Sequence, residues 1–332
     1  MTKKLISVVA LCIGAAMMFS CQQAEEPGLE QGQAPETRAY GDKTPKVAVY
    51  VETNDVNPLN CGDYTLPNGK AFFDIVELFA SNIHKRTVGG VVQPTLYLND
   101  KMTNLLENGG YLTYVKPLQD KGIKVLLTVL GDHQGIGVAS MNPTQTTQFA
   151  RILAEAVRRY NLDGIGFDDE YADANNIAGS YNSIITKLHA LLPADKLITV
   201  FEWGSFDDIQ ADGKACVDYA YHGYFGAYRA SSEMGLGRDR WAPVALNFSY
   251  GYDLQIVMQQ AANAKNGGYG AMMCFNIRRS SWSDPTNVLT ALASGAGYGV
   301  PVTRTGGDRP QDWTFVPSGY TITVDDVDPS IP

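Results

Sequence analysis

The residues best suited to chemistry lie in the segment LDGIGFDDEY, residues 162–171, where an apolar run ends in acidic side chains. Asp168 and Glu170 are two positions apart, so on a strand both side chains leave the same face, about 7 Å apart along the chain. Ile165 and Phe167 would then face the opposite, apolar side. Two neighbouring carboxyl groups can divide the roles of proton donor and anion between them. The alternative is an acidic turn that caps the next helix, since helix starts favour Asp.

Composition places the chain among ordinary globular proteins. Of its 332 residues, 45% are hydrophobic and 18% are charged, which suits one large domain with appendages. The formal net charge of −9 argues against nucleic acid as a partner, because binding to nucleic acid requires a clustered basic face.

Residues 1–20 have the composition of a signal peptide. Two lysines precede an apolar run of about fifteen residues, which is short for a membrane-spanning helix of about twenty. Ser20 before Cys21 completes the string MFSC, which resembles a bacterial lipoprotein box in which Cys21 is acylated. The alternative is an ordinary secretory peptide with an incidental cysteine.

Residues 21–45 predict a flexible tether, because they are rich in Gly, Pro, Gln and Glu. Glu25 and Glu26 resemble the acidic export signal of some Gram-negative lipoproteins. We therefore expect a monomer that is lipid-anchored to the bacterial outer membrane, at the cell surface or facing the periplasm. The lipid anchor is its only expected membrane contact.

Three cysteines follow the leader, namely Cys61, Cys216 and Cys274. Their number is odd and none lies in a CxxC or Cys/His pattern with zinc spacing, so neither a disulfide framework nor a metal finger is indicated. Cys216 and Cys274 lie in apolar runs and are interpreted as core residues. A single disulfide among the three stays open, and no metal or cofactor is expected.

From residue 46 onward, short apolar runs alternate with helical patterns. Eight runs rich in Val, Ile, Phe and Tyr predict strands at 46–52, 72–81, 123–131, 162–170, 196–203, 216–224, 242–250 and 270–277. Apolar residues at helical spacing predict helices at 147–160, 180–192 and 253–265. Apolar strands separated by helices indicate a parallel sheet that helices cover.

Eight such units over about 250 residues match the size of an α/β fold, the (β/α)8 TIM barrel. We predict a single barrel domain over residues 46–298 with a short C-terminal extension at 299–332, in which 313–316 and 320–324 resemble strands. The alternative is an open doubly wound sheet. Neither GxGxxG nor GxxxxGK[ST] follows the first strand, so the nucleotide-binding signatures of that fold are missing.

Polar and aromatic residues gather where the predicted strands end, which is where active sites of such barrels lie. We expect them to form a substrate-binding mouth around the two carboxyl groups. The candidates are Glu52, Asn54, His133, Gln134, Trp203, Tyr221, His222, Asn247 and Asn276. Aromatic rings suit the faces of pyranose sugars, although core packing explains aromatic residues equally well.

The segment LDGIGFDDEY resembles the DxxDxDxE signature of family 18 glycoside hydrolases. The strings KVAVYVETNDVNPLNCGDYTL, GIKVLLTVLGDHQGIG, YNLDGIGFDDEYAD and GYGAMMCFNI resemble the endo-β-N-acetylglucosaminidases of the endoglycosidase H group, over about residues 46–290. This resemblance implies a (β/α)8 barrel that cuts the N,N′-diacetylchitobiose core of N-linked glycans and leaves one GlcNAc on the asparagine. High-mannose or hybrid chains are the favoured substrates.

The resemblance also implies roles for three residues. Enzymes of this family use substrate assistance, in which the C2-acetamide oxygen of the sugar attacks C1. Glu170 takes the place of the general acid/base, and Asp168 that of the carboxylate that binds the acetamide N–H and stabilises the oxazolinium charge. Tyr224, in an NxY-like pattern after the sixth strand, takes the place of the tyrosine that orients the acetamide carbonyl.

Two positions depart from the family pattern. Gly166 replaces the middle Asp of the signature, which in relatives shares a proton with the following Asp. A water or a side chain from a neighbouring strand would have to substitute for it. His222 stands where Asn or Gln would stand in the NxY pattern, and its charge varies with pH. Asp163 matches the first Asp of the signature and is interpreted as structural.

Two other functions fit the sequence. A non-catalytic surface glycan-binding protein on the same barrel is suggested by Gly166 and the tether, although such a protein needs no proton donor at Glu170. A divalent-metal hydrolase built on Asp168, Asp169 and Glu170 is the other, and few converging ligands support it.

Overall fold

The computed structural model describes residues 43–230, 235–278, 284–310 and 318–332. The predicted signal peptide, Cys21 and nearly all of the tether lie outside the described residues, as does the strand expected at 313–316. Within the described ranges, no helix is both long enough and apolar enough to cross a membrane.

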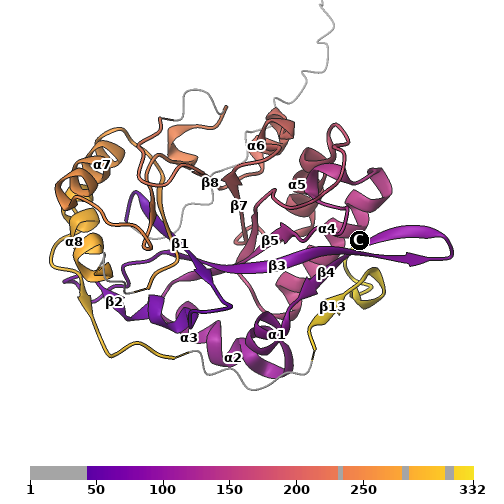
Figure 1. The fold of residues 1–332 in the computed structure, drawn as a ribbon, viewed down its shortest axis with the longest axis horizontal. Coiled ribbons are helices and arrows are strands. Elements are labelled where there is room, and N and C mark those ends of the chain that lie inside the picture. Colours follow the sequence, from indigo (N-terminus) through magenta and orange to yellow (C-terminus); the bar gives the residue numbers. More distant parts are fainter. Residues whose placement is uncertain (1–42, 231–234, 279–283, 311–317) are drawn as a thin grey trace, which may run out of the picture. The chain divides into compact units, whose positions relative to one another are not determined.

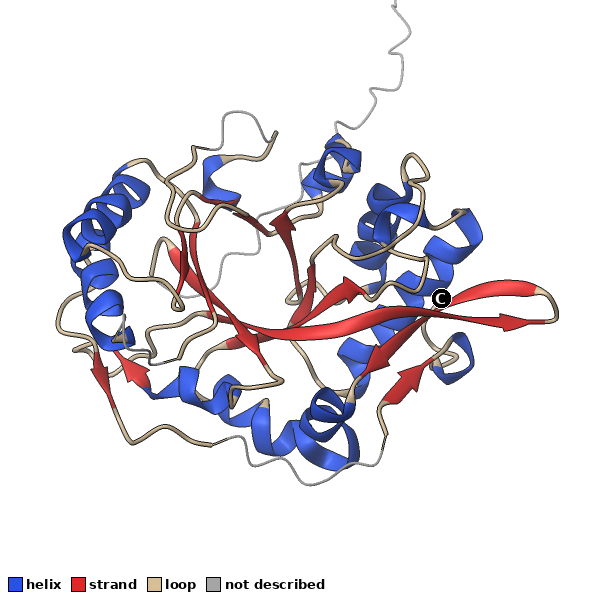
Figure 2. Ribbon diagram, in the orientation of Figure 1, coloured by secondary structure: helices blue, strands red, loops and turns tan. Residues whose placement is uncertain are grey.

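Parallel strands form a barrel-like sheet that helices surround (Figures 1 and 2). Its strands follow the order β10-β11-β1-β3-β5-β6-β7-β8-β9. Their bounds are β1 (Lys46–Glu52), β3 (Ile75–Val88), β5 (Lys124–Gly131), β6 (Gly164–Phe167), β7 (Leu197–Glu202), β8 (Tyr219–His222), β9 (Trp241–Ala242), β10 (Ala245–Asn247) and β11 (Ala271–Phe275).

The seventh barrel strand is broken into β9 and β10, which only Pro243 and Val244 separate. β9 pairs with β8 and β10 pairs with β11, both in parallel, so one chain segment closes the ring. Proline has no N–H to donate to a strand neighbour, and the Pro243 carbonyl accepts from the backbone N–H of Arg229 at 2.9 Å. Counted in this way, the eight predicted strands are present, and the (β/α)8 TIM-barrel class is confirmed.

The three predicted helices are α4 (Pro143–Arg159), α5 (Ser180–Leu191) and α7 (Leu254–Asn266). Asn142 caps α4 by accepting from the backbone N–H groups of Thr144 and Gln145, each at 3.0 Å. The other helices are α1 (Asp100–Leu106), α2 (Gly110–Tyr114), α3 (Lys116–Gln119), α6 (Ala211–Ala215) and α8 (Pro285–Ala296). The β/α alternation is imperfect, because a 3-10 turn (Pro58–Asp63) stands between β1 and β3 in place of a helix.

A long hairpin extends β3 beyond the barrel. β3 continues to Val88 and pairs antiparallel with β4 (Val91–Leu98), so that the two strands project together (Figure 1). Gly89 and Gly90 form the turn with φ values of 56° and 81°, which favour glycine. The predicted strand ended at residue 81, so the hairpin is an addition to the prediction.

The C-terminal extension pairs with two parts of the barrel domain. β12 (Thr303–Arg304) pairs antiparallel with β2 (Tyr64–Thr65), and β13 (Tyr320–Ile322) pairs antiparallel with β4. Near the end of the chain, the Arg151 guanidinium donates to the carbonyl of Ile331 at 2.9 Å. The extension therefore gives the hairpin strand β4 a second neighbour.

Alternate residues of each barrel strand face two different apolar layers. Ile165 and Phe167 of β6 lie in the large layer between strands and helices, where Phe167 contacts the ring of Tyr181 at 5.7 Å. A smaller cluster that includes Tyr50 and Tyr221 fills the inside of the barrel. Asp168 follows Phe167, so its side chain points to the inside of the barrel.

Cys61, Cys216 and Cys274 form no disulfide with one another, which answers the open question of a disulfide among the three. Cys61 and Cys274 are buried and Cys216 is half-buried. Burial raises the pKa of the Cys61 and Cys274 thiols, as befits cysteines that serve as small apolar residues.

Candidate active site

A cavity of about 440 Å³ opens where the barrel strands end. Its lining is mostly aromatic, with three carboxylates among the rings. The lining residues are Tyr50, Glu52, Phe79, Leu130, Asp168, Glu170, Tyr171, Phe201, Trp203, Gly223, Phe225 and Phe275. Most of them lie late in their strands or shortly after them, and Phe79 pairs with Glu52 at the end of β1. The cavity therefore occupies the carboxyl face, where barrel enzymes do their chemistry.

Asp168 is the most buried acid of this cavity. Its backbone N–H donates to the Val129 carbonyl at 3.0 Å, which continues the β5–β6 pairing by one residue. Its Oδ1 atom is buried and has no hydrogen-bond partner in the described part of the chain. Burial raises the pKa of Asp168 well above its usual range, and the nearby Glu170 and Asp169 raise it further. This direction differs from the expectation that Asp168 stays ionised, because burial and the two neighbouring carboxyl groups disfavour its charged form.

Glu170 is half-buried and stands nearer the solvent. The segment that carries it passes close to the end of β5, where the Gly131 N–H donates to the Glu170 carbonyl at 3.1 Å. A Cβ at Gly131 would lie 2.3 Å from that carbonyl oxygen, so the approach requires glycine. Burial and the neighbouring Asp169 raise the pKa of Glu170, which is the direction that a proton donor needs.

Asp169 points away from the other two acids. Its Oδ2 accepts from the backbone N–H of Ser205 at 2.8 Å and so holds the loop that follows β7. A Cβ at Gly204 would lie 2.1 Å from the Asp169 carbonyl, so the two segments touch. Among the residues that the structure describes, no three His, Cys, Asp or Glu side chains gather as metal ligands would.

Aromatic rings form the wall of the cavity. Phe201 lies against Phe225 with ring centroids 6.3 Å apart, and Phe225 contacts Phe275 at 5.5 Å. The ring centroids of Trp203 and Phe201 lie 6.5 Å apart. Trp203 is 40% exposed, so its ring is accessible to a ligand. Apart from Glu52, Trp203 and the two acids, the lining residues were not predicted. In the sequence, they can be recognised as residues near the end of a strand whose side chains alternate with those that face the helices. Phe275 is an example, and it pairs in register with Tyr50.

Tyr224 lies at the rim of the cavity. It follows the lining residue Gly223 and is 54% exposed. The ring centroids of Tyr224 and Trp203 lie 5.7 Å apart. The Arg229 guanidinium lies 5.3 Å from the centre of the Tyr224 ring. The structure thus brings the three residues expected to be catalytic to one mouth.

Tyr221 and His222 do not reach the cavity, which differs from the sugar contacts expected of them. Tyr221 lies in the barrel interior, where its ring contacts Tyr50 at 5.8 Å. His222, the next residue on β8, is buried with the opposite parity, and its Nδ1 accepts from the backbone N–H of Tyr224 at 3.2 Å. Burial lowers the pKa of His222 to about 4, so its charge changes only at acid pH.

Three further candidates lie on exposed loops outside the cavity lining. Asn54 Oδ1 accepts from the Asn99 side chain at 2.9 Å. The His133 ring pairs with the Asp173 carboxylate at 2.8 Å. Gln134 donates to the Asp132 carbonyl at 3.0 Å.

Asn247 and Asn276 are buried and engaged by the protein. Asn247 ends β10, and its Oδ1 accepts from the backbone N–H of Ser249 at 2.9 Å. Asn276 donates to the carboxylate of Glu52, which also accepts from Arg278 at 2.6 Å. Asn276 therefore acts on the cavity through the lining residue Glu52.

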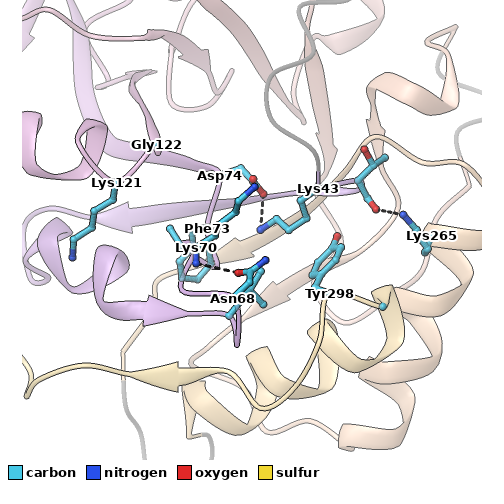
Figure 3. A pocket seen from close by; sticks show the side chains of 13 residues that line it. Lys43, Asn68, Lys70, Phe73, Asp74, Lys121, Gly122, Lys265 and Tyr298 are labelled. Carbon is cyan, nitrogen blue, oxygen red and sulfur yellow. Dashed lines mark hydrogen bonds and ion pairs between the residues drawn. The ribbon is translucent and has the colours of Figure 1, made fainter.

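A second cavity of about 490 Å³ lies at the opposite ends of the strands (Figure 3). Its residues precede β1, β3, β5 and β11, so it belongs to the amino face of the barrel. Lys43 pairs with Asp74 at 2.8 Å, and Lys265 donates to the Thr44 carbonyl at 2.6 Å (Figure 3). We assign no chemistry to this cavity, because conserved barrel geometry places active sites at the other end.

Comparison with known proteins identifies relatives along most of the chain. No family model matches the sequence. The chain is 33% identical over 268 residues to an endo-β-N-acetylglucosaminidase of Flavobacterium sp. (strain SK1022), which covers 76% of this chain and 81% of that protein. It is 31% identical over 287 residues to endo-β-N-acetylglucosaminidase F1 of Elizabethkingia meningoseptica, covering 81% and 82%.

Solved structures show the same barrel. EndoBT-3987 of Bacteroides thetaiotamicron with a Man5GlcNAc product has a TM-score of 0.68 at 28% identity, covering 84% of this chain and 66% of that one. The same enzyme with a Man9GlcNAc2Asn substrate has a TM-score of 0.68 at 27% identity, covering 84% and 72%. This chain thus spans about two thirds of the length of EndoBT-3987.

A GH18 chitinase from Pseudoalteromonas aurantia has a TM-score of 0.52 at 15% identity, covering 75% of this chain and 99% of that one, a likeness of fold alone. The two relatives above 30% identity are each spanned over more than 80% of their length. On these grounds the chain belongs to the endo-β-N-acetylglucosaminidases, glycoside hydrolases built on the family 18 barrel.

Proposed function

We propose that this endo-β-N-acetylglucosaminidase cuts the GlcNAc-β1,4-GlcNAc core of N-linked glycans by substrate-assisted, retaining hydrolysis. The observation that carries the proposal is the carboxyl pair in the aromatic cavity. Glu170 is half-buried with a raised pKa, and Asp168 beside it has a buried Oδ1 without a partner among the described residues. A GlcNAc acetamide N–H is a donor of the kind that this oxygen lacks.

In the first step, protonated Glu170 donates its proton to the glycosidic oxygen. The acetamide oxygen of the same sugar attacks C1, and the bond to the leaving GlcNAc breaks with its electron pair on that oxygen. Asp168 accepts the acetamide N–H, and the positive charge of the forming oxazolinium lowers the pKa of Asp168, which favours its anionic form. Binding of substrate thus offsets the burial that keeps Asp168 neutral in the free protein.

In the second step, the Glu170 carboxylate takes a proton from water, and the hydroxyl oxygen attacks C1 from the face that the leaving group left. The oxazolinium ring opens and restores the acetamide, so the configuration at C1 is retained. The Tyr224 hydroxyl at the rim would orient the acetamide carbonyl. The exposed Trp203 ring would stack on a sugar face.

High-mannose or hybrid chains are the proposed substrates. The solved complexes of EndoBT-3987 hold Man5GlcNAc and Man9GlcNAc2Asn, both of the mannose-rich class. The cavity volume of about 440 Å³ is within the usual range for small-ligand sites, so the outer mannose branches would lie on the loops around it.

We further propose that the protein acts as a monomer held by lipid on Cys21 at the bacterial outer membrane. The lysine-flanked apolar leader and the string MFSC support this proposal. In membrane fractions, replacing Cys21 by Ser should release the protein into the soluble fraction. An unchanged distribution would contradict lipidation at Cys21.

The test of the proposed activity uses a glycoprotein with a known high-mannose chain. The wild-type protein should reduce the glycan to one GlcNAc, measured as a mass decrease of the protein product. Glu170→Gln should lower kcat by about 10³-fold or more, because an amide cannot donate the proton. EDTA should leave the rate unchanged, and a loss of activity with EDTA would favour the metal-dependent alternative.

Two outcomes would contradict the enzyme. If wild type and the Glu170→Gln variant both bind the glycan and neither cuts it, the chain is a glycan-binding protein. If the variant cuts as fast as wild type, another group donates the proton.

A further inference from the structure

Glu77 is a carboxyl group with no exposed surface, inside the barrel below the cavity. The Thr128 hydroxyl donates to its Oε2 at 3.1 Å, and the Thr199 hydroxyl donates to its Oε1 at 2.6 Å. No ion pair to Glu77 occurs within the described ranges of the chain. A buried carboxyl without a counter-ion costs stability, so its presence calls for a role.

The carboxyl of Glu77 fills the space next to Gly166. A Cβ on Gly166 would lie 2.3 Å from Glu77 Oε2 and 3.0 Å from the Thr199 hydroxyl. The backbone of Gly166 is outside the positive-φ region, so its conformation is open to any residue. Gly164 differs, because its φ is 154° and a Cβ there would lie 2.0 Å from the Leu197 carbonyl oxygen. Glycine is therefore needed at position 166 chiefly because Glu77 is there.

Tyr50 connects Glu77 with Asp168 electrostatically. Its ring lines the cavity together with Asp168, and its hydroxyl is buried without a hydrogen-bond partner in the described structure. Burial raises the pKa of Tyr50 well above its usual range, and Glu77, Tyr221 and Asp168 raise it further. One buried hydroxyl is thus within reach of the charge of both carboxyl groups.

We propose that Glu77 is a positioning residue for Asp168. From β3, it supplies the buried carboxyl group that β6 lacks at position 166. Of the two carboxyl groups, Glu77 carries the proton while Asp168 carries the negative charge. Two carboxyl groups in one region of low dielectric do not both ionise readily. A proton on Glu77 therefore permits the anion at Asp168 that the oxazolinium requires. This inference rests on the proposed function.

The titration of Glu77 suits this task. Burial raises the pKa of Glu77 to about 7, although the hydrogen bonds from Thr199 and Thr128 lower it in part. The titratable groups that sense the charge of Glu77 are Tyr50 from β1 and Tyr221 from β8, and neither of them is a cation. As pH rises through 7, ionisation of Glu77 should add a second negative charge near Asp168 and slow the reaction.

The experiment moves the carboxyl from one strand to the other. Glu77→Ala should lower kcat by about 10- to 100-fold, the range for a misplaced catalytic group, with KM changed little. Adding Gly166→Asp to Glu77→Ala should recover at least about tenfold of that loss, because the removed carboxyl leaves room for the new one. Gly166→Asp alone should be poorly active, since Glu77 occupies its space.

Two further variants separate positioning from structure. Glu77→Gln should remove from the pH profile of kcat/KM the ionisation near 7 that wild type shows. Glu155→Gln alters another buried glutamate, on α4 and paired with Arg158 at 2.7 Å, and should lower stability with kcat unchanged.

The outcomes distinguish this proposal from the proposed function. If wild type cuts glycans, and the Glu77→Gln profile superimposes on that of wild type, Glu77 is structural and the proposal is overturned. If the double variant folds but is no more active than Glu77→Ala, the proposal is overturned as well. Should the double variant not fold, the pH profile of Glu77→Gln decides. If wild type cuts nothing, the proposed function and this inference fall together.

Discussion

At the scale of single residues, burial explains the chemistry of the carboxyl groups. Asp168, Glu170 and Glu77 all have a raised pKa, and burial is the largest cause for each. The sequence predicted Asp168 and Glu170 because their spacing on a strand is visible in one segment. Glu77 could not be found in this way, since its relation to Gly166 depends on two strands that the barrel brings together from 89 positions apart.

The raised pKa of Glu77 has a consequence for stability. A carboxyl group whose pKa is raised on folding binds more protons in the folded state, so its stabilising effect is present at low pH and is lost as pH rises. For Glu77, with a pKa of about 7 against an ordinary 4.5, the loss between pH 4.5 and 7 amounts to about 3 kcal/mol. Glu77→Gln should abolish this loss, and urea unfolding at several pH values measures it. If the free energy of unfolding changes equally with pH in wild type and in Glu77→Gln, Glu77 does not titrate with a raised pKa in the folded protein.

At the scale of elements, strand ends decide which side chains reach the cavity. The eight strands were predictable because they are short, apolar and rich in β-branched and aromatic residues. The break at Pro243 in the seventh strand and the hairpin of β3 and β4 were not predicted. The hairpin had a signal, since Gly89 and Gly90 between two runs of strand-forming residues are typical of a tight turn. α8 was not predicted, although its buried apolar residues recur at helical spacing.

Gly131 links the end of β5 to the segment that carries Glu170. Gly131→Ala would place a Cβ 2.3 Å from the Glu170 carbonyl oxygen and should shift the segment that carries the proton donor. We expect kcat to fall by about 10- to 100-fold with the barrel intact. Gly307→Ala is the matched control, because nothing lies within 4 Å of a Cβ there, and it should leave kcat unchanged. Equal rates in both variants would show that the close approach is unimportant.

At the scale of the whole molecule, the barrel class and the function followed from the sequence, whereas the cavity wall did not. The order of the strands places Tyr50, Phe79, Phe201 and Phe275 around one mouth, although each looks like a core residue in its own segment. Several polar residues expected at the mouth, such as His222 and Asn247, are buried and engaged elsewhere. A residue's place in a strand was thus a better guide than its polarity.

The C-terminal extension offers a test at this scale. Deleting residues 318–332 would remove β13, the second neighbour of β4, and the contact of Arg151 with Ile331. We expect the melting temperature to fall by about 2–8 °C, the shift for a loss of about 1–2 kcal/mol in a large domain. The kcat of the truncated protein should stay within about twofold of wild type, because no residue of this segment lines the cavity. A large loss of kcat without a change in melting temperature would show that the extension acts on the site.

The central claim is that the substrate's own acetamide displaces the leaving sugar between Asp168 and Glu170. Real-time proton NMR of wild-type protein acting on Man9GlcNAc2-Asn tests it most directly, because the anomeric signal of the released glycan reports both cleavage and stereochemistry. The account predicts that the β-anomer appears first and then equilibrates with the α-anomer. First appearance of the α-anomer would contradict it.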